Sequence, residues 1–145
     1  MRVMVLVKST PETEQAASPS EQAIAEMLEF NEELVNAGVM VDGDGLAPSA
    51  NGARVRWEKG DIRVIDGPFT ESKELVAGYW VWEVKSLEEA IARHEPRLSS
   101  VQGEDWEVEI RPFVQPEDFG EALTPELQAK NDELRAREQA QQERR

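Results

Sequence analysis

The chain of 145 residues contains no cysteine and only one histidine, His94. The absence of cysteine excludes disulfide bonds, thiolate metal sites and a cysteine nucleophile. A zinc site would have to use several carboxylates, which zinc sites rarely do, and a Ser-His-Asp triad would depend on His94 alone. We therefore expect no metal and no cofactor. A chain without cysteine also fits a reducing, cytoplasmic location.

Long hydrophobic runs and positive charge are also scarce. The apolar stretch near the N-terminus covers only residues 3–7, which is too short for the core of a signal peptide or for a membrane span. Lys and Arg number 16 against 30 Asp and Glu, so the net charge is -14. Such an acidic protein repels phosphate backbones and anionic lipid surfaces. We expect a soluble protein that binds neither nucleic acid directly nor a membrane.

The hydrophobic pattern predicts the order β-α-β-hairpin-β-α-β. Strands are expected at residues 2–8, 39–41, 78–84 and 106–111, helices at about 20–37 and 86–95, and hairpin arms at 54–57 and 62–65. The segment Asp42-Gly43-Asp44-Gly45 is expected to end the second strand. The apolar side chains that recur at helical spacing in the first helix are Ile24, Met27, Leu28, Leu34 and Val35.

This order is that of a ferredoxin-like antiparallel sheet of the α+β class, with two helices on one face and an inserted β-hairpin. We expect residues 1–120 to form this domain. Residues 121–145 are expected to form a polar helical tail, with Thr124 as N-cap and Pro125 at the first helical position.

The first and third strands of the predicted sheet are apolar on both faces, which is typical of central strands. In the first strand one face carries Val3, Val5 and Val7 and the other Met4 and Leu6; in the third strand one face carries Trp80, Trp82 and Val84 and the other Tyr79 and Val81. Because the helices cover only one face, the other face needs a second cover. We expect a second copy of the chain to supply it, in a homodimer whose sheets lie face to face.

The segment Asp66-Gly67-Pro68-Phe69 has a structural interpretation as a rigid turn followed by an aromatic core anchor. A turn alone does not call for Glu71 and Lys73, which follow it directly. Carboxylates beside a lysine at the edge of an apolar cavity can perform acid–base chemistry or bind a polar ligand. We predict Asp66, Glu71 and Lys73 as catalytic candidates. The predicted ligand-binding candidates are Lys8, Asp42, Gly67, Pro68, Phe69, Trp80 and Trp82.

Residues 66–80, DGPFTESKELVAGYW, closely resemble the signature of the YciI-related proteins called the DGPF-domain family. Further matches are Gly45-Leu46-x-Pro48-Ser49, the helix start at residues 86–90 and the ending at residues 109–112. The resemblance covers roughly residues 1–113. It implies a dimeric α+β barrel made of ferredoxin-like halves, and no settled general activity.

Two further implications of the resemblance concern function. Some related proteins are thought to use a His–Asp pair in the cleft between the sheets. This chain departs from that pattern, because His94 lies near the end of the second helix, where the helix macrodipole favours a histidine. Other members are associated with extracytoplasmic-function sigma factors, which implies a role in transcription that would here run through protein contacts.

Two functions therefore remain open. In the first, a small, flat or aromatic molecule binds in the cleft of the dimer between Trp80, Trp82 and Phe69. Any reaction there would be cofactor-independent proton transfer or elimination, with Lys73 stabilising the anion. In the second, a regulatory protein contacts a protein partner through its acidic surface and its tail. We favour the first, because tryptophans and charges beside a rigid turn suit a pocket better than a flat interface.

Overall fold

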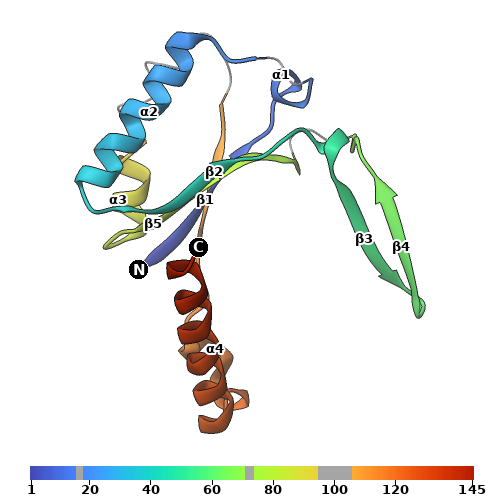
Figure 1. Cartoon of the computed structure of the whole chain (residues 1–145), viewed down its shortest axis with the longest axis vertical. Helices are drawn as coiled ribbons and strands as arrows, with labels where there is room; N and C mark the ends of the chain where they lie inside the picture. The colour runs from blue at the N-terminus through green and yellow to red at the C-terminus, as the bar shows by residue number, and fades with distance from the viewer. Residues whose placement is uncertain (16–17, 71–73, 95–105) are drawn as a thin grey trace. The chain divides into compact units, whose positions relative to one another are not determined.

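The computed structural model describes residues 1–15, 18–70, 74–94 and 106–145, and the chain divides into two units, Met1–Phe113 and Val114–Arg145. The helices and strands of the first unit are shown in Figure 1. They are β1 (Arg2–Lys8), α1 (Pro11–Glu14), α2 (Glu21–Asn36), β2 (Met40–Gly45), η1 (Ser49–Asn51), β3 (Ala53–Glu58), β4 (Asp61–Asp66), β5 (Val76–Glu83), α3 (Leu87–Ala92) and β6 (Val108–Pro112).

Four antiparallel strands form one sheet in the order β2-β5-β1-β6, with β1 and β5 in the centre. Helices α2 and α3 cover one face of this sheet (Figure 1). The predicted ferredoxin-like α+β arrangement is therefore confirmed, including its central strands. Among the described residues the two edge strands do not pair, so the sheet does not close into a barrel within one chain. Pairing with a second copy stays a prediction.

The hydrophobic core lies between this sheet and its two helices. Alternate residues of β1 and β5 supply its strand side, and Phe30, Leu34 and Ala90 supply the helix side. The buried set is Val3, Val5, Phe30, Leu34, Val39, Trp80, Trp82, Val84 and Ala90. The alternation predicted which side chains share a face within each central strand, and the pairing of β1 with β5 places the Val3 and Trp82 faces on the same side of the sheet.

Helix α2 begins close to the predicted position, where Ser20 caps it by accepting a hydrogen bond from the N–H of Ala23. The face of the helix that packs is narrower than predicted. Ile24, Leu28 and Val35 are 48%, 62% and 60% exposed, whereas Phe30 and Leu34 are buried. The predicted apolar stripe spans more of the helix circumference than the sheet contacts, so its outer members are exposed.

Strand β2 does not end at Asp42, contrary to the prediction from its two Asp-Gly pairs. The strand continues through Gly45 after a register irregularity between Met40 and Asp42. A Cβ atom at Gly43 would lie 2.8 Å from Cδ1 of Trp80. The glycine is required here for close packing against a tryptophan, and it does not form a turn.

The predicted hairpin is confirmed as a separate two-stranded ribbon of β3 and β4, which we call the ribbon. Lys59 and Gly60 form its tip with φ angles of 51° and 82°, which are typical of a type I′ turn.

The second unit contains η4 (Pro116–Ala122) and α4 (Pro125–Glu143), and Thr124 caps α4 by accepting from the N–H of Leu127. This confirms the predicted tail helix. None of the helices in the described ranges is long and apolar enough to cross a membrane.

Candidate functional site

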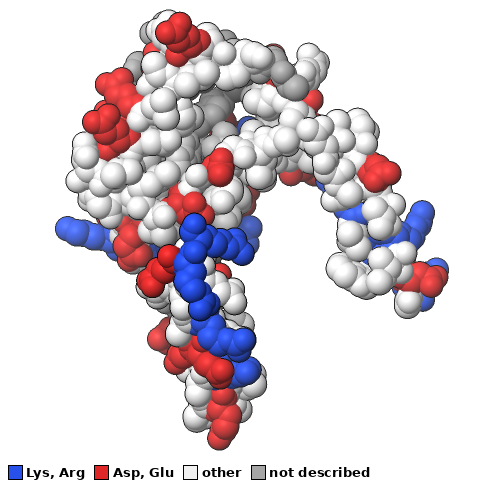
Figure 2. All heavy atoms as spheres, viewed as in Figure 1, with Lys and Arg blue, Asp and Glu red and all other residues white. Residues whose placement is uncertain are grey.

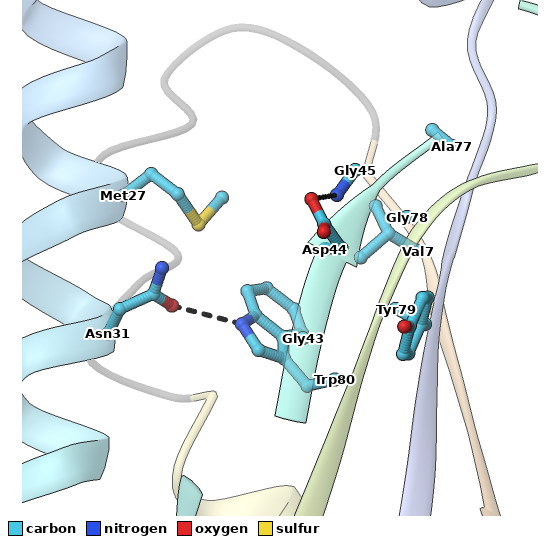
Figure 3. Close-up of a pocket in the computed structure, with 10 residues that line it drawn as sticks. All are labelled: Val7, Met27, Asn31, Gly43, Asp44, Gly45, Ala77, Gly78, Tyr79 and Trp80. Carbon is cyan, nitrogen blue, oxygen red and sulfur yellow. Dashed lines mark hydrogen bonds between the residues drawn. The ribbon is translucent and has the colours of Figure 1, made fainter. Parts of the chain in front are cut away.

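A cavity of about 300 Å³ lies between helix α2 and strands β1, β2 and β5 (Figure 3). Its size is at the lower end of the range for small-molecule sites. The residues that line it are Val7, Met27, Asn31, Gly43, Asp44, Gly45, Ala77, Gly78, Tyr79 and Trp80. The glycines allow the strand backbones to lie close together, and the side chains of Met27 and Asn31 extend toward the strands from the helix (Figure 3).

The cavity contains one fixed hydrogen-bond pair, in which Nε1 of Trp80 donates to Oδ1 of Asn31 at 3.0 Å. This contact orients the amide of Asn31. In the part of the chain that the structure describes, Nδ2 of Asn31 has no acceptor. Asp44 lies at the rim of the cavity on β2, paired with Tyr79, and its Oδ1 accepts from the N–H of Gly45 at 2.9 Å. The site therefore offers an unused donor between mostly apolar walls, with a carboxylate at its rim.

The sequence analysis did not single out Asn31 as a site residue. Its position contains a signal, because it lies four residues after Met27 and three before Leu34, on the side of α2 that faces the sheet. A polar side chain in an otherwise apolar stripe needs a partner or a ligand. That pattern is visible in the sequence, but its meaning depends on knowing that Trp80 lies opposite.

The two tryptophans that were predicted to line a cleft between sheets lie on the helix-covered face instead. Trp80 borders the cavity, and Trp82 is 0% exposed in the core. Trp82 packs edge-to-face against Phe30, with ring centroids 6.1 Å apart. Side chains of β5 alternate between the two faces of the sheet. Val81 therefore lies on the face without helices, which we call the open face, and both tryptophans lie on the face covered by α2 and α3. Their placement in a cleft between two sheets was therefore wrong.

Lys8 and Asp42 lie away from this cavity's lining and are each engaged with a neighbour. Nζ of Lys8 is 3.2 Å from Oε1 of Glu109, and this contact, followed by Arg111, holds the pKa of Glu109 below its ordinary value. Oδ2 of Asp42 accepts from the hydroxyl of Tyr79 at 3.4 Å. The charge of Asp42 is the largest cause of a raised pKa at Tyr79, and burial is the next. These pairs flank the apolar side chains of the open face.

The Gly67-Pro68-Phe69 turn lies at the base of the ribbon. The backbone N–H of Phe69 donates to Oγ of Ser49 at 3.0 Å, and that hydroxyl donates to Oε2 of Glu14 at 2.5 Å. The backbone N–H of Ser49 also donates to Glu14, at 3.2 Å. The guanidinium of Arg54 lies 3.9 Å from the ring centroid of Phe69, within the range of a cation–π contact. The turn thus connects α1, η1 and the ribbon.

Of the three catalytic candidates, the structure describes only Asp66. Asp66 is exposed at the end of β4 and does not line the cavity. Glu71 and Lys73 lie outside the described residues. The remaining candidates occupy four places, namely the cavity, the hydrophobic core, the open face of the sheet and the turn at the base of the ribbon. Within the described ranges, no group of three or more His, Asp or Glu is placed to hold a metal ion.

The comparison with known proteins agrees with this architecture. Residues 1–114 match the family of the YCII-related domain. The chain belongs to this family. An uncharacterized protein of Rhizobium meliloti (strain 1021) is 31% identical over 96 residues, which cover 65% of this chain and 75% of that protein. The match includes the sheet, both of its helices and the ribbon.

The histidine of this YCII-related domain is a core residue. Helix α3 ends at Ala92, and the imidazole of His94 is 8% exposed, with its ring centroid 4.9 Å from that of Trp82. Neither ring nitrogen has a hydrogen-bond partner among the described residues. Burial lowers the pKa of His94 below its ordinary 6.5. The expected macrodipole role needs a charged imidazolium, so that interpretation is wrong.

Lowering the pH from about 7.5 to about 5.5 is expected to reduce the free energy of unfolding through His94. Because its pKa is lowered by folding, the unfolded chain binds a proton that the folded core resists. The contribution of neutral His94 to the free energy of unfolding is complete above the ordinary pKa of 6.5 and is lost as the pH falls below that value. Urea unfolding across this range measures the effect. In His94→Phe the pH dependence should be smaller, and an equal dependence in both proteins would contradict the assignment.

Proposed function

We propose that this YCII-related protein binds a small, flat molecule in the cavity between α2 and the sheet. The observation that supports this most directly is the unused Nδ2 donor of Asn31, whose Oδ1 is held by Trp80. Small-molecule sites place a few such polar groups between apolar walls.

The lining defines the chemistry of the ligand. The indole of Trp80 and the side chain of Met27 favour an aromatic or heteroaromatic ring. Nδ2 of Asn31 requires an acceptor on that ring. The carboxylate of Asp44 disfavours an anion. A neutral ring with a carboxamide substituent has all of these features.

We further propose that the protein is a homodimer in which the open faces of two sheets meet. Val81 is buried near the centre of this face, and Met4, Leu6 and Tyr79 are half-buried around it, without a covering helix from the described part of Met1–Phe113. A second copy would remove this apolar surface from water. Native mass spectrometry tests the proposal, and a monomer at micromolar concentration would contradict it.

Binding is the function proposed, and acid–base catalysis by Asp66, Glu71 and Lys73 stays a prediction. A second candidate function is regulation by contact with a protein partner, with sigma-factor-dependent transcription as one setting. One observation favours it, because Leu127 and Leu134 of α4 are 55% and 47% exposed and no side chain of α4 is buried. Deleting residues 121–145 should abolish partner capture without changing ligand binding if this second function holds.

Replacing Asn31 with leucine is expected to weaken ligand binding about tenfold, which corresponds to one lost hydrogen bond. Ligand-observed NMR with benzamide and benzoate as probes provides the measurement. Benzamide should bind and benzoate should not, since Asp44 repels its carboxylate. Asn36→Leu is the matched control, because Asn36 lies exposed at the end of the same helix. Equal benzamide binding in Asn31→Leu and the parent protein would contradict the proposed site.

A further inference from the structure

The two faces of the ribbon differ in chemistry. The register pairs Val55 with Val64 and Trp57 with Ile62, so these four side chains lie on one face. We call this set the apolar face of the ribbon. The opposite face pairs Arg56 with Arg63, Arg54 with Ile65 and, next to the tip, Glu58 with Asp61. The ribbon is therefore amphipathic from Arg54 to Ile65, and Asp66 pairs with Ala53 at its base.

The apolar face is open to solvent. Val55, Trp57, Ile62 and Val64 are 49%, 74%, 65% and 65% exposed. All residues of β3 are exposed, and no third strand of the described chain pairs with the ribbon (Figure 1). A two-stranded ribbon is marginally stable alone, and a contiguous exposed apolar patch marks an interaction surface.

The base of the ribbon fixes which face remains free. On its basic face, Arg54 stacks on Phe69 of the Gly67-Pro68-Phe69 turn. The N–H of Gly67 donates to the carbonyl of Gly52, just before β3, at 3.1 Å. The domain thus holds the ribbon through its basic face, and the apolar face is presented outward.

Charge indicates the kind of partner. Residues 53–66 carry four basic and three acidic side chains, a net charge of +1 in a chain of net charge -14. Figure 2 shows basic and acidic side chains together on the ribbon and acidic side chains over the region of α2. The rest of a second copy is strongly acidic and therefore attracts the ribbon. Two-fold symmetry would form the contact twice.

We infer that the apolar face of the ribbon is a contact surface for a second copy of this chain. The inference rests on the proposed homodimer and adds a second contact to it. The open face of the sheet has four central apolar side chains. The area that they can bury is small compared with the roughly 800 Å² per partner of a standard interface. Contacts made by the ribbons of the two copies enlarge the apolar area buried in the dimer. The Gly67-Pro68-Phe69 turn then has the role of holding the ribbon in the position required for this contact.

Sedimentation velocity over a range of concentrations tests the inference with the double variant Trp57→Ser/Ile62→Ser. The dissociation constant of the dimer should rise by at least about 30-fold, as expected when interface hot-spot residues are truncated. Leu127→Ser/Leu134→Ser removes two exposed apolar side chains from α4 and should leave the constant unchanged. A monomeric parent would overturn both the homodimer and the inference. A parent and a ribbon variant that dimerise equally well would overturn the inference alone.

A second measurement does not depend on the folding of the double variant. Because the chain has no cysteine, Ile62→Cys introduces a single thiol on the apolar face. Its rate of alkylation should fall as the protein concentration rises through the dissociation constant, because dimer formation covers it. Leu134→Cys should be alkylated at a rate independent of concentration. An Ile62→Cys rate that is equally constant while the protein dimerises would overturn the inference.

Discussion

Replacing Trp82 with alanine is expected to lower the free energy of unfolding by about 3–5 kcal/mol. The side chain is completely buried, and its ring contacts those of Phe30, Trp80 and His94 with centroid distances of 6.1, 5.8 and 4.9 Å. Removing the indole loses its burial and leaves a cavity that the surrounding aromatic rings cannot fill completely. Urea unfolding followed by circular dichroism measures the loss.

A matched truncation on the surface separates this core role from a role in ligand binding. Leu28→Ala removes an apolar side chain that is 62% exposed on α2, and it should change the free energy of unfolding by less than about 0.5 kcal/mol. If Trp82→Ala instead retained full stability and lost benzamide binding, Trp82 would be a ligand contact and the described core would be incorrect.

The fold could be predicted from the sequence because its local signals agree with one another. Strands β1 and β5 are apolar on both faces, which identified them as central. Ser20 and Thr124 cap α2 and α4 by accepting from the backbone N–H groups of Ala23 and Leu127. At the start of α3, Oγ of Ser86 accepts from the N–H of Glu89, and the Glu89 carboxylate accepts from the N–H of Lys85 at 2.6 Å. The start of α3 was therefore predictable, although the detail of its cap was not.

The candidate site was less predictable, because it depends on contacts between distant segments. Asn31 meets Trp80 across 49 positions, and Ser49 meets Glu14 across 35. No local pattern indicates either pair. Grouping charged and aromatic residues by nearness in sequence placed Trp82 and Asp66 in one site, whereas alternation along β5 buries Trp82 and β4 ends with Asp66 exposed. Knowledge of which face the helices cover was needed first.

Replacing Gly67 with alanine is expected to lower the free energy of unfolding by about 1–3 kcal/mol. A Cβ atom at this position would overlap the backbone carbonyl of Ser49, and a backbone group cannot rotate away as a flexible side chain can. The turn or η1 would have to move. Such a shift disturbs the hydrogen bonds that Ser49 makes with Phe69 and Glu14. Urea unfolding measures the cost.

Gly52→Ala is the control, since it lies in the same region and its added Cβ would meet the same Ser49 carbonyl oxygen at 3.6 Å, an ordinary contact. Its effect should be clearly smaller than that of Gly67→Ala. If the two variants were equally stable, the fit between the turn and η1 would be loose, and the ribbon could not be held in one orientation. A selective loss in Gly67→Ala, with weaker dimerisation, would instead show that the glycine of the DGPF segment positions the ribbon for assembly.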